Sequence, residues 1–365
     1  MKRFKIVAVL GARPQFIKCA AMARILESPP IKKRLEWTWV NTGQHYDYRL
    51  SGLFFKELKL PQFKYDLRIG SYPHGKQTGL MLEKIERVLL KERPGLVLVF
   101  GDTNSTLAGA LAASKLHIPV AHVEAGLRSF NRTLPEEVNR VLTDRVSSLL
   151  FCPTRRAVDQ LKREGILRGV YLAGDVMADL LGASKKILKS GGRKKSYYLA
   201  TVHRNTNTDN RARLSKIFKA LGALDKEVIF PLHPRTRDIL RRDAGLRARV
   251  RSHKNLKLAA PASYLNMIRL EKNSAGIITD SGGVQKEAFL LGVPCVTLRE
   301  ETEWTETVRY GLNTLCRPNA RDILKAFKKM NKRKLRKIPP VFGRGDASKK
   351  IVSRLVGYLN QSGNR

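Results

Sequence analysis

Short apolar runs alternate with helix-like segments along nearly the whole chain, and this pattern constrains the fold more than any other feature. The apolar runs have the length of β-strands and lie at residues 4–10, 37–41, 96–100, 119–123, 150–152, 197–202, 228–231, 276–279 and 295–298. The segments between them carry apolar side chains at the three- and four-residue spacing of helices. Short apolar strands that alternate with helices predict parallel sheets covered by helices on both faces.

A change in composition near the middle of the chain predicts two domains. Residues 183–196 are rich in Lys and Arg and contain two adjacent glycines, and the strand–helix pattern restarts after them. We therefore expect an α/β protein with two Rossmann-like, doubly wound domains that face each other across a cleft, the usual place for a ligand. The expected parts are an N-terminal domain (1–175), a basic linker (176–196), a C-terminal domain (197–345), and a C-terminal helix that packs back on the first domain (346–365).

The chain carries a large excess of positive charge, which raises the question of a nucleic-acid or anionic membrane partner. It has 70 Lys and Arg against 31 Asp and Glu in 365 residues, a formal net charge of +39. The basic residues are dispersed, with local clusters at 185–195 and 328–337, and form no single stripe interleaved with aromatic side chains. A solvated basic surface is therefore the favoured interpretation, and we expect no specific nucleic-acid partner.

Cysteine usage and hydropathy predict a cytoplasmic protein without a membrane span. Cys19, Cys152, Cys295 and Cys316 are far apart and form no C-x-x-C motif, which indicates neither a zinc site nor a disulfide framework. The apolar run after the N-terminal basic residues is too short for a signal-peptide core. No stretch approaches the 18 apolar residues that a membrane helix requires.

Two acidic residues come just after neighbouring predicted strands. Asp102 follows the run at 96–100, and Glu124 follows the run at 119–123. Ligands of parallel α/β sheets bind beyond the carboxyl ends of the strands, so both side chains should face one crevice. Further along the chain, residues 281–283 read Ser-Gly-Gly at a predicted helix start, where free backbone N–H groups favour phosphate. These groups together predict an enzyme that acts on a nucleotide-linked substrate.

Six motifs, taken in their order and spacing, identify a family. They are Gly11-Ala12-Arg13-Pro14-Gln15-Phe16-Ile17-Lys18, Thr42-Gly43-Gln44-His45, Gly101-Asp102-Thr103-Asn104-Ser105, His122-Val123-Glu124-Ala125-Gly126-Leu127-Arg128, Pro135-Glu136-Glu137-Val138-Asn139-Arg140 and Thr279-Asp280-Ser281-Gly282-Gly283-Val284-Gln285-Lys286-Glu287. Each motif alone is common. Together they resemble the non-hydrolysing UDP-N-acetylglucosamine 2-epimerases from about residue 4 to residue 358. That family has the two-domain, glycosyltransferase-B-like fold.

The resemblance implies a chemistry that the residues can be checked against. The proton on C2 of a UDP-hexosamine is not acidic, because no carbonyl group is attached to that carbon. The family is understood to eliminate UDP to a 2-acetamidoglucal, to protonate the other face of C2, and to add UDP back. This scheme needs a carboxylate base, an acid on the opposite face and firm binding of the departing diphosphate. It needs no metal and no cofactor, and the chain has no G-x-G-x-x-G fingerprint after its first strand.

The resemblance also assigns residues to these roles. The catalytic residues would be Asp102, Glu124, Glu136 and His203. The substrate contacts would come from Arg13, Lys18, Gln44, His45, Arg140, His233, Tyr264, Ser281, Gly282, Gly283, Glu287 and Glu306. The sequence does not say which carboxylate is the base and which is the acid, and a homodimer is the expected assembly.

Several of these residues also have ordinary structural interpretations. Asp102 could cap the helix that starts near Ser105. Glu124 could form a salt bridge with Arg128, and Glu136 could complement the dipole of its helix. His233 could be a structural histidine, the paired glycines could form only a tight turn, and Glu287 could be a surface position.

Departures from the family pattern bear on the substrate. Ala12, Gln15 and Trp304 differ from the usual hexosamine enzymes and resemble the subgroup that acts on UDP-2,3-diacetamido-2,3-dideoxyglucuronate, a precursor of O-antigen and capsule. A neutral Gln15 would suit an acidic sugar, because a like charge nearby would weaken binding. Asp47, where allosterically regulated relatives carry Gln, argues against such regulation. The alternatives are a plain UDP-N-acetylglucosamine 2-epimerase, which gives UDP-N-acetylmannosamine, and a glycosyltransferase on the same fold.

Overall fold

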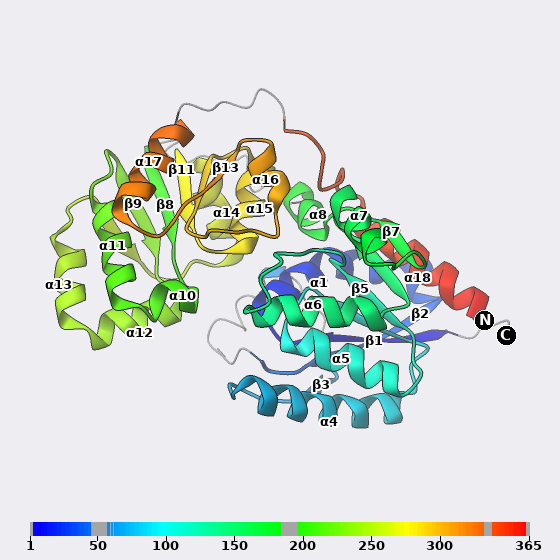
Figure 1. The fold of residues 1–365 in the computed structure, drawn as a ribbon. Coiled ribbons are helices and arrows are strands. Elements are labelled where there is room, and N and C mark those ends of the chain that lie inside the picture. Colours follow the sequence, from blue (N-terminus) through cyan, green and yellow to red (C-terminus); the bar gives the residue numbers. More distant parts are fainter. Residues whose placement is uncertain are drawn as a thin grey trace. The chain divides into compact units, whose positions relative to one another are not determined.

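Two compact units make up the chain in the computed structural model, which describes residues 3–44, 57, 58, 60, 62–183, 196–331 and 338–362. The first unit comprises Met1–Ala183 together with Pro340–Arg365, and the second comprises Ser184–Pro339. Each unit is a parallel sheet with helices packed on it (Figure 1). The α/β fold expected from the alternating pattern is therefore confirmed. His45, Asp47 and residues 184–195 of the expected linker lie outside the described residues.

The sheet of the first unit has seven strands in the order β3-β2-β1-β4-β5-β6-β7. They are β1 (Phe4–Leu10), β2 (Leu35–Asn41), β3 (Tyr65–Asp66), β4 (Leu96–Phe100), β5 (Val120–Val123), β6 (Leu149–Cys152) and β7 (Val170–Leu172). Every neighbouring pair runs parallel. In the centre of the sheet, Val9 of β1 lies opposite Val40 of β2 and Val99 of β4. All five residues of β4 are buried, as expected for a strand covered on both faces.

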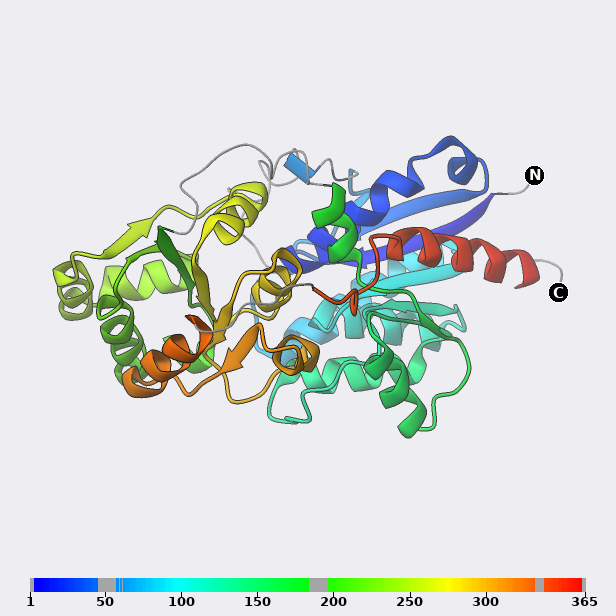
Figure 2. The same cartoon turned by 90° about the horizontal axis from the view of Figure 1, so that it is seen from above.

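Helices form two layers around this sheet. They are α1 (Arg13–Leu26), α2 (Pro29–Lys32), α4 (His74–Glu92), α5 (Asn104–Lys115), α6 (Pro135–Val146), α7 (Arg155–Arg163), α8 (Val176–Ala183) and α18 (Ala347–Ser362). Helix α5 packs between α4 and α6, and α1 packs against α8 and α18. Figure 1 shows α4 and α5 on the opposite side of β1 from α1, and Figure 2 shows the C-terminal helix α18 in red.

Two boundaries in this unit differ from the sequence-based expectation. Residues 176–183, assigned to the linker, form α8, because Val176, Met177, Leu180 and Leu181 are apolar and become buried. Helix α6 ends at Val146, and β6 begins at Leu149, one residue before the predicted run at 150–152, because Leu149 pairs with Ala121 of β5. Apolar residues at the end of a helix and at the start of the next buried strand cannot be separated by periodicity alone.

The sheet of the second unit has six strands in the order β10-β9-β8-β11-β12-β13. They are β8 (Tyr197–Thr201), β9 (Glu227–Pro231), β10 (Leu256–Ala259), β11 (Gly276–Thr279), β12 (Cys295–Thr297) and β13 (Asn313–Leu315). Its helices are α10 (Asn205–Thr208), α11 (Arg211–Gly222), α12 (Pro234–Arg242), α13 (Ala244–Ser252), α14 (Tyr264–Asn273), α15 (Gly282–Leu291), α16 (Thr305–Arg309) and α17 (Ala320–Asn331). Helix α11 packs with α17, and α14 packs with α15. Gly292 caps the C-terminus of α15 with a φ of 71°, a left-handed conformation that glycine adopts readily.

Both sheets reverse their strand order at the corresponding point. The chain moves outward in one direction from β1 to β3 and then crosses to β4, and it moves in the same way from β8 to β10 before it crosses to β11. In open α/β sheets this switch point lies where ligands bind, beyond the carboxyl ends of the strands. Asp102 follows β4, and Ser281 follows β11, so the two strongest sequence signals stand at the two switch points.

Candidate active site

In the first unit, the expected site residues follow four adjacent strands, β2, β1, β4 and β5. The loop after β2 is tied to the start of α5: the Gln44 side-chain oxygen accepts hydrogen bonds from the Ser105 backbone N–H at 3.0 Å and from its hydroxyl at 2.7 Å. The Thr42 hydroxyl also lies 2.8 Å from that of Ser105. The ends of these strands are therefore linked by side chains that are distant in the sequence.

Asp102 is held by α6 and does not cap α5. The N-cap of α5 is Thr103, whose hydroxyl accepts a hydrogen bond from the Thr106 backbone N–H, so the capping interpretation of Asp102 is wrong. The Asp102 carboxylate pairs with Arg140, and its backbone carbonyl accepts a hydrogen bond from the Asn139 side chain at 3.0 Å. The Asp102 side chain remains 32% exposed. It is thus fixed in direction while part of its surface stays accessible.

Glu124 pairs with Lys18 of α1, and the expected alternative, a salt bridge to Arg128, is wrong. Arg128 instead contacts two other carboxylates, at 2.7 Å each. The backbone of Glu124 has a φ of 74°, a left-handed conformation that is costly for a residue with a Cβ atom and often marks functional sites. Gly101 makes room for the ion pair, because a Cβ there would lie 2.9 Å from the Lys18 Nζ.

Glu136 lies in the first turn of α6 and is half-buried. The next residue, Glu137, is buried and holds the loop before the helix: its carboxylate accepts hydrogen bonds from the backbone N–H groups of Ser129 and Phe130, both at 2.9 Å. Glu137 also accepts one from Arg140 at 2.5 Å. Arg140 therefore bridges Glu137 and Asp102, and this part of α6 is a network of charged side chains.

Gln15 does not lie where a neutral side chain beside an acidic sugar was expected. Its side-chain oxygen accepts hydrogen bonds from the N–H groups of Gly11 and Ala12, at 2.8 and 3.0 Å. Its amide nitrogen donates to the Phe100 carbonyl and to the Thr106 hydroxyl, both at 2.9 Å. The amide is buried, and its hydrogen bonds are made inside the unit. The expectation that Gln15 faces an acidic sugar is therefore wrong. Arg13, by contrast, is half-buried at the start of α1.

In the second unit, three helices begin just after three adjacent strands. They are α10 after β8, α12 after β9 and α15 after β11. Ser281 is the N-cap of α15 and accepts a hydrogen bond from the Val284 N–H, while Gly282 and Gly283 form the first residues of the helix. The N–H groups of a first helical turn have no partner within the helix and attract anions. The geometry thus suits a phosphate group, as the sequence predicts.

Two histidines lie together beside this helix start. The rings of His203 and His233 stack, with centroids 4.8 Å apart. His233 caps α12, since its Nδ1 accepts a hydrogen bond from the Arg235 N–H at 3.2 Å, which leaves the ring proton on Nε2. Buried Asp280 accepts hydrogen bonds from the backbone N–H groups of His203 and Arg204 at 3.0 to 3.1 Å. The sequence predicts both histidines as site residues, and the structure brings them into contact.

The remaining predicted residues of the second unit are buried side chains of α14, α15 and α16. They are Tyr264, Glu287 and Glu306. The carboxyl groups of Glu287 and of Glu271 on α14 lie near each other; burial, and then the nearby Glu287, raise the pKa of Glu271 well above its usual value. Both carboxylate oxygens of Glu306 are enclosed, and among the described residues neither has a hydrogen-bond partner.

Trp304 adjoins the helix start at Ser281. The Nζ atom of Lys286 lies 4.0 Å from the centroid of its ring, a cation–π contact. A Cβ atom at Gly282 would lie 3.4 Å from the Trp304 ring nitrogen. The segment that carries Trp304 is tied to α15, because the Thr302 hydroxyl donates to the Gln285 side chain at 2.8 Å.

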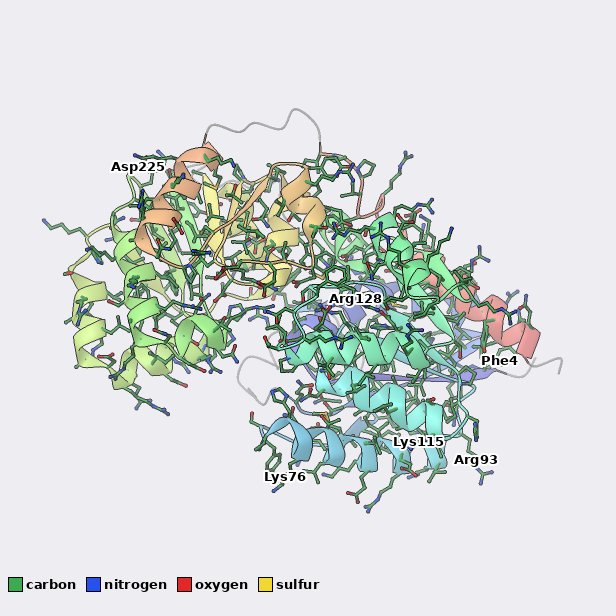
Figure 3. All side chains as sticks on the ribbon, viewed as in Figure 1. Phe4, Lys76, Arg93, Lys115, Arg128 and Asp225 are labelled. Carbon is green, nitrogen blue, oxygen red and sulfur yellow. The ribbon has the colours of Figure 1, made fainter. Side chains whose placement is uncertain are left out.

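A buried charge network next to Glu124 escaped the sequence analysis. His122 contacts Asp144, and Asp144 and Glu164 both bind Arg128, which Figure 3 labels. Burial raises the pKa of Asp144, but the partners His122 and Arg128 outweigh this and hold it below its usual value. Burial opposes the charge of Arg128 in the same way, and its two carboxylate partners nevertheless raise its pKa. The only sequence signal was the presence of His122 and Arg128 in one of the family motifs.

Comparison with known proteins decides the family. The family model described as UDP-N-acetylglucosamine 2-epimerase matches residues 30–356. The chain belongs to this family. A protein of Methanococcus maripaludis, called a UDP-N-acetylglucosamine 2-epimerase homolog, is 51% identical over 96% of this chain and 99% of its own length. The UDP-2,3-diacetamido-2,3-dideoxy-D-glucuronate 2-epimerase of Pseudomonas aeruginosa is 46% identical over 96% of this chain and 99% of its own.

A solved structure of a UDP-N-acetylglucosamine 2-epimerase has the same fold. The Methanocaldococcus jannaschii enzyme, in complex with UDP-GlcNAc and UDP, superposes with a TM-score of 0.89 at 44% identity and covers 98% of this chain and 100% of its own. Like its relatives, this member of the family is thus an isomerase of UDP-sugars. Across the described ranges, no helix has the length and apolar character to cross a bilayer. The same residues contain no group of three or more His, Cys, Asp or Glu side chains placed to hold a metal ion.

Proposed function

We propose that this protein inverts C2 of a UDP-2-acetamido sugar by eliminating UDP and adding it back. The observation that supports the proposal is that the two switch points carry different kinds of chemical groups. The first unit holds partly accessible carboxylates beyond β4 and β5, and the second unit holds a capped, glycine-rich helix start and two stacked histidines beyond β8, β9 and β11. Carboxylates suit proton transfer, and a helix start suits a diphosphate.

The proposed reaction balances with no added reactant. A carboxylate removes the C2 proton while the C1–O bond to UDP breaks, which leaves a glycal with a C1=C2 double bond and free UDP. A second acid then protonates the other face of C2, and a UDP oxygen adds back to C1. We assign these proton transfers to Asp102, Glu124 and Glu136, and the stabilisation of the departing diphosphate to His203.

The substrate contacts follow the same division. We propose that Ser281, Gly282 and Gly283 bind the diphosphate together with Arg13 and His233, and that Glu287 accepts from the ribose hydroxyls. The enclosed carboxylate of Glu306 supports a contact there, because a ligand donor would satisfy it. The proposed contacts with the sugar and nucleotide also include Lys18, Gln44, His45, Arg140 and Tyr264.

The mechanism is tested by isotopes. Elimination requires that the bridging oxygen of labelled UDP-sugar scrambles with the other oxygens of the β-phosphate and that solvent deuterium enters C2. We expect both during turnover, measured by NMR and mass spectrometry. Epimerised product with the label still in its bridging position would exclude elimination. A heat-inactivated sample is the control for chemical exchange.

The UDP site is tested by thermal unfolding. UDP should raise the melting temperature, because it binds only the folded protein. The double variant Ser281→Ala/Glu287→Ala should lose most of this shift. Asn210→Ala, which removes the N-cap of α11 in the same unit, is the matched control and should keep it. An undiminished shift in the double variant would place the nucleotide elsewhere.

We propose UDP-2,3-diacetamido-2,3-dideoxyglucuronate as the preferred sugar nucleotide. After the correction for Gln15, the proposal depends on the Trp304 segment beside the helix start and on the similarity to the Pseudomonas aeruginosa enzyme. The alternative is UDP-N-acetylglucosamine, favoured by the Methanocaldococcus jannaschii 2-epimerase, which is 45% identical. C2 inversion followed by proton NMR with each nucleotide decides between them. Faster turnover of UDP-N-acetylglucosamine would refute the preference and leave the elimination chemistry standing.

We further propose a homodimer that acts in the cytoplasm on a precursor of surface polysaccharide. The four cysteines are buried and unpaired, which favours a reducing compartment. Val138 and Leu142, one turn apart on α6, are 44% and 43% exposed, an apolar stripe that a second copy could cover. Analytical ultracentrifugation should show a dimer. Substituting Glu at both positions should give a monomer if this stripe is the interface.

A further inference from the structure

His122 lies on β5, is fully buried, and has both ring nitrogens engaged. Nε2 lies 2.7 Å from the carbonyl oxygen of Gly101, and Nδ1 lies 2.8 Å from the Asp144 carboxylate. A carbonyl oxygen can only accept, so the Nε2 atom must donate its proton to Gly101. An ionised Asp144 also only accepts, so Nδ1 donates as well. Both ring nitrogens are therefore held by acceptors from other elements, the turn after β4 and α6.

The Asp144 carboxylate that contacts His122 is also held by other donors. Asp144 bonds to His122 through one oxygen, and through the other it accepts hydrogen bonds from Arg128 at 2.7 Å and from the Gly126 N–H at 3.1 Å. Glu164 contacts the far side of Arg128, at 2.7 and 2.8 Å. Arg128 is thus paired with two carboxylates, which makes its buried charge tolerable.

The network ends on the backbone that carries the proposed catalytic carboxylates. Gly101, whose carbonyl oxygen accepts the hydrogen bond from His122, has a φ of 65° and directly precedes Asp102. Glu124 follows His122 by two residues on the same strand end. Asp144 belongs to α6, the helix from which Asn139 and Arg140 hold the Asp102 backbone and side chain. His122 therefore links β5, the turn after β4 and α6.

We propose that His122 is a positioning residue: its Nε2–H bond to the Gly101 carbonyl fixes the turn that aims Asp102 at the reacting carbon. The inference rests on the proposed function, because it gives Asp102 a role in proton transfer. A misaligned acid–base group lowers turnover steeply while substrate binding persists, since proton transfer depends on distance and direction. The expected signature is a lower kcat with an unchanged KM.

Two isosteric substitutions separate the two hydrogen bonds of the ring. In His122→Gln the amide nitrogen can take the place of Nε2 and still donate to Gly101, but the contact with Asp144 is lost. In His122→Asn the amide nitrogen takes the place of Nδ1, keeps Asp144 and loses Gly101. Each variant removes one hydrogen bond of a buried ring, so a purely structural role predicts similar losses of stability and of activity in both.

We expect kcat to fall by about 10- to 100-fold in His122→Asn and much less in His122→Gln, with KM within about threefold of wild type in both. His117→Asn is the control, because His117 is exposed, lies before β5 at the end of the strand opposite to Glu124, and has a φ of 56° that Asn tolerates. Equal losses in the two His122 variants, or a change in KM alone, would overturn the proposal. Should either variant fail to fold, Asp144→Asn takes its place. Asn keeps the shape of the Asp144 side chain but weakens its hold on the His122 ring, so kcat must fall without a rise in KM. An unchanged kcat would overturn the proposal.

The same assays separate this proposal from the proposed function. Wild-type protein that converts no UDP-sugar would contradict the function itself. A converting wild type with a fully active Asp102→Asn variant would contradict the role of Asp102. An inactive Asp102→Asn together with a fully active His122→Asn would contradict the positioning role and leave the proposed function standing.

Discussion

Asp102 and Asp280 follow corresponding strands of two sheets with the same strand order, but their carboxylates are used in opposite ways. Asp102 is paired with one cation from α6 and keeps 32% of its side chain exposed. Asp280 is fully buried, and its oxygens accept from the backbone N–H groups of His203 and Arg204 and from the Asn207 side chain at 3.0 to 3.1 Å. One aspartate is available for chemistry, and the other shapes the loop that presents a histidine. The same fold therefore supports either role, and the neighbouring donors decide which.

A similar contrast separates Glu92, a buried carboxylate of the first unit, from Glu271, a buried carboxylate of the second. In the first unit, Glu92 accepts from Lys5 at 3.0 Å, from Lys64 at 2.8 Å and from the Tyr65 hydroxyl at 2.5 Å. In the second unit, Glu271 lies near another carboxyl group, that of Glu287, and within the described residues neither Glu271 oxygen has a hydrogen-bond partner. Cations favour the ionised form of the first, and a like charge with burial favours the protonated form of the second. The contributions of Glu92 and Glu271 to stability should thus change with pH in opposite directions.

The largest effect is expected from Asp102→Asn. The substitution keeps the size of the side chain and removes the carboxylate, so turnover should fall by about 100-fold or more, the range for a positioned acid–base group. The shift of the melting temperature by UDP should survive, because Asp102 is not among the proposed contacts with the nucleotide. Steady-state kinetics and thermal unfolding measure the two effects. Turnover close to that of wild type would assign Asp102 to structure, as Asp280 is here.

Asp280→Asn should produce the reverse pattern. An amide nitrogen would replace an oxygen that accepts from backbone N–H groups, and the second unit should lose about 2 kcal/mol of unfolding free energy. Because the His203 loop is then loosened, the UDP-induced shift should also shrink. Urea unfolding with and without UDP is the measurement. A variant with unchanged stability but a loss of turnover like that of Asp102→Asn would break the comparison.

Glu92→Gln tests the pH response of the first unit. Burial alone raises the pKa of Glu92, but hydrogen bonds from two lysines and a tyrosine outweigh it and lower the pKa to about 2. The carboxylate therefore stabilises the fold above the usual pKa of 4.5, and the contribution is lost as pH falls toward 2. The variant should be less stable at neutral pH by on the order of 1–2 kcal/mol, a figure reduced for the exposure of the lysines. The difference from wild type, measured by thermal unfolding, should vanish near the lower pKa.

Glu271→Gln should have the smallest effect and the opposite sign. Burial, and then Glu287, raise the pKa of Glu271, so the unfolded chain releases this proton before the folded protein does. That difference costs stability as pH rises above the usual value of 4.5. A permanently neutral Gln should therefore raise the melting temperature at alkaline pH and leave it nearly unchanged in acid. A lower melting temperature at alkaline pH would mean that the pair is held ionised by its surroundings.

The sequence by itself determined the two-unit α/β fold, most of the strands and the helix start at Ser281. These depend on apolar spacing and on residues within one turn of each other, which local patterns report directly. The partners of the charged residues were decided only by the tertiary structure. Glu124 meets Lys18 rather than nearby Arg128, and Gln15 joins the ends of β1 and β4 rather than facing a sugar. Such contacts join residues tens to more than one hundred positions apart, and their geometry exists only after the sheets and helices have packed.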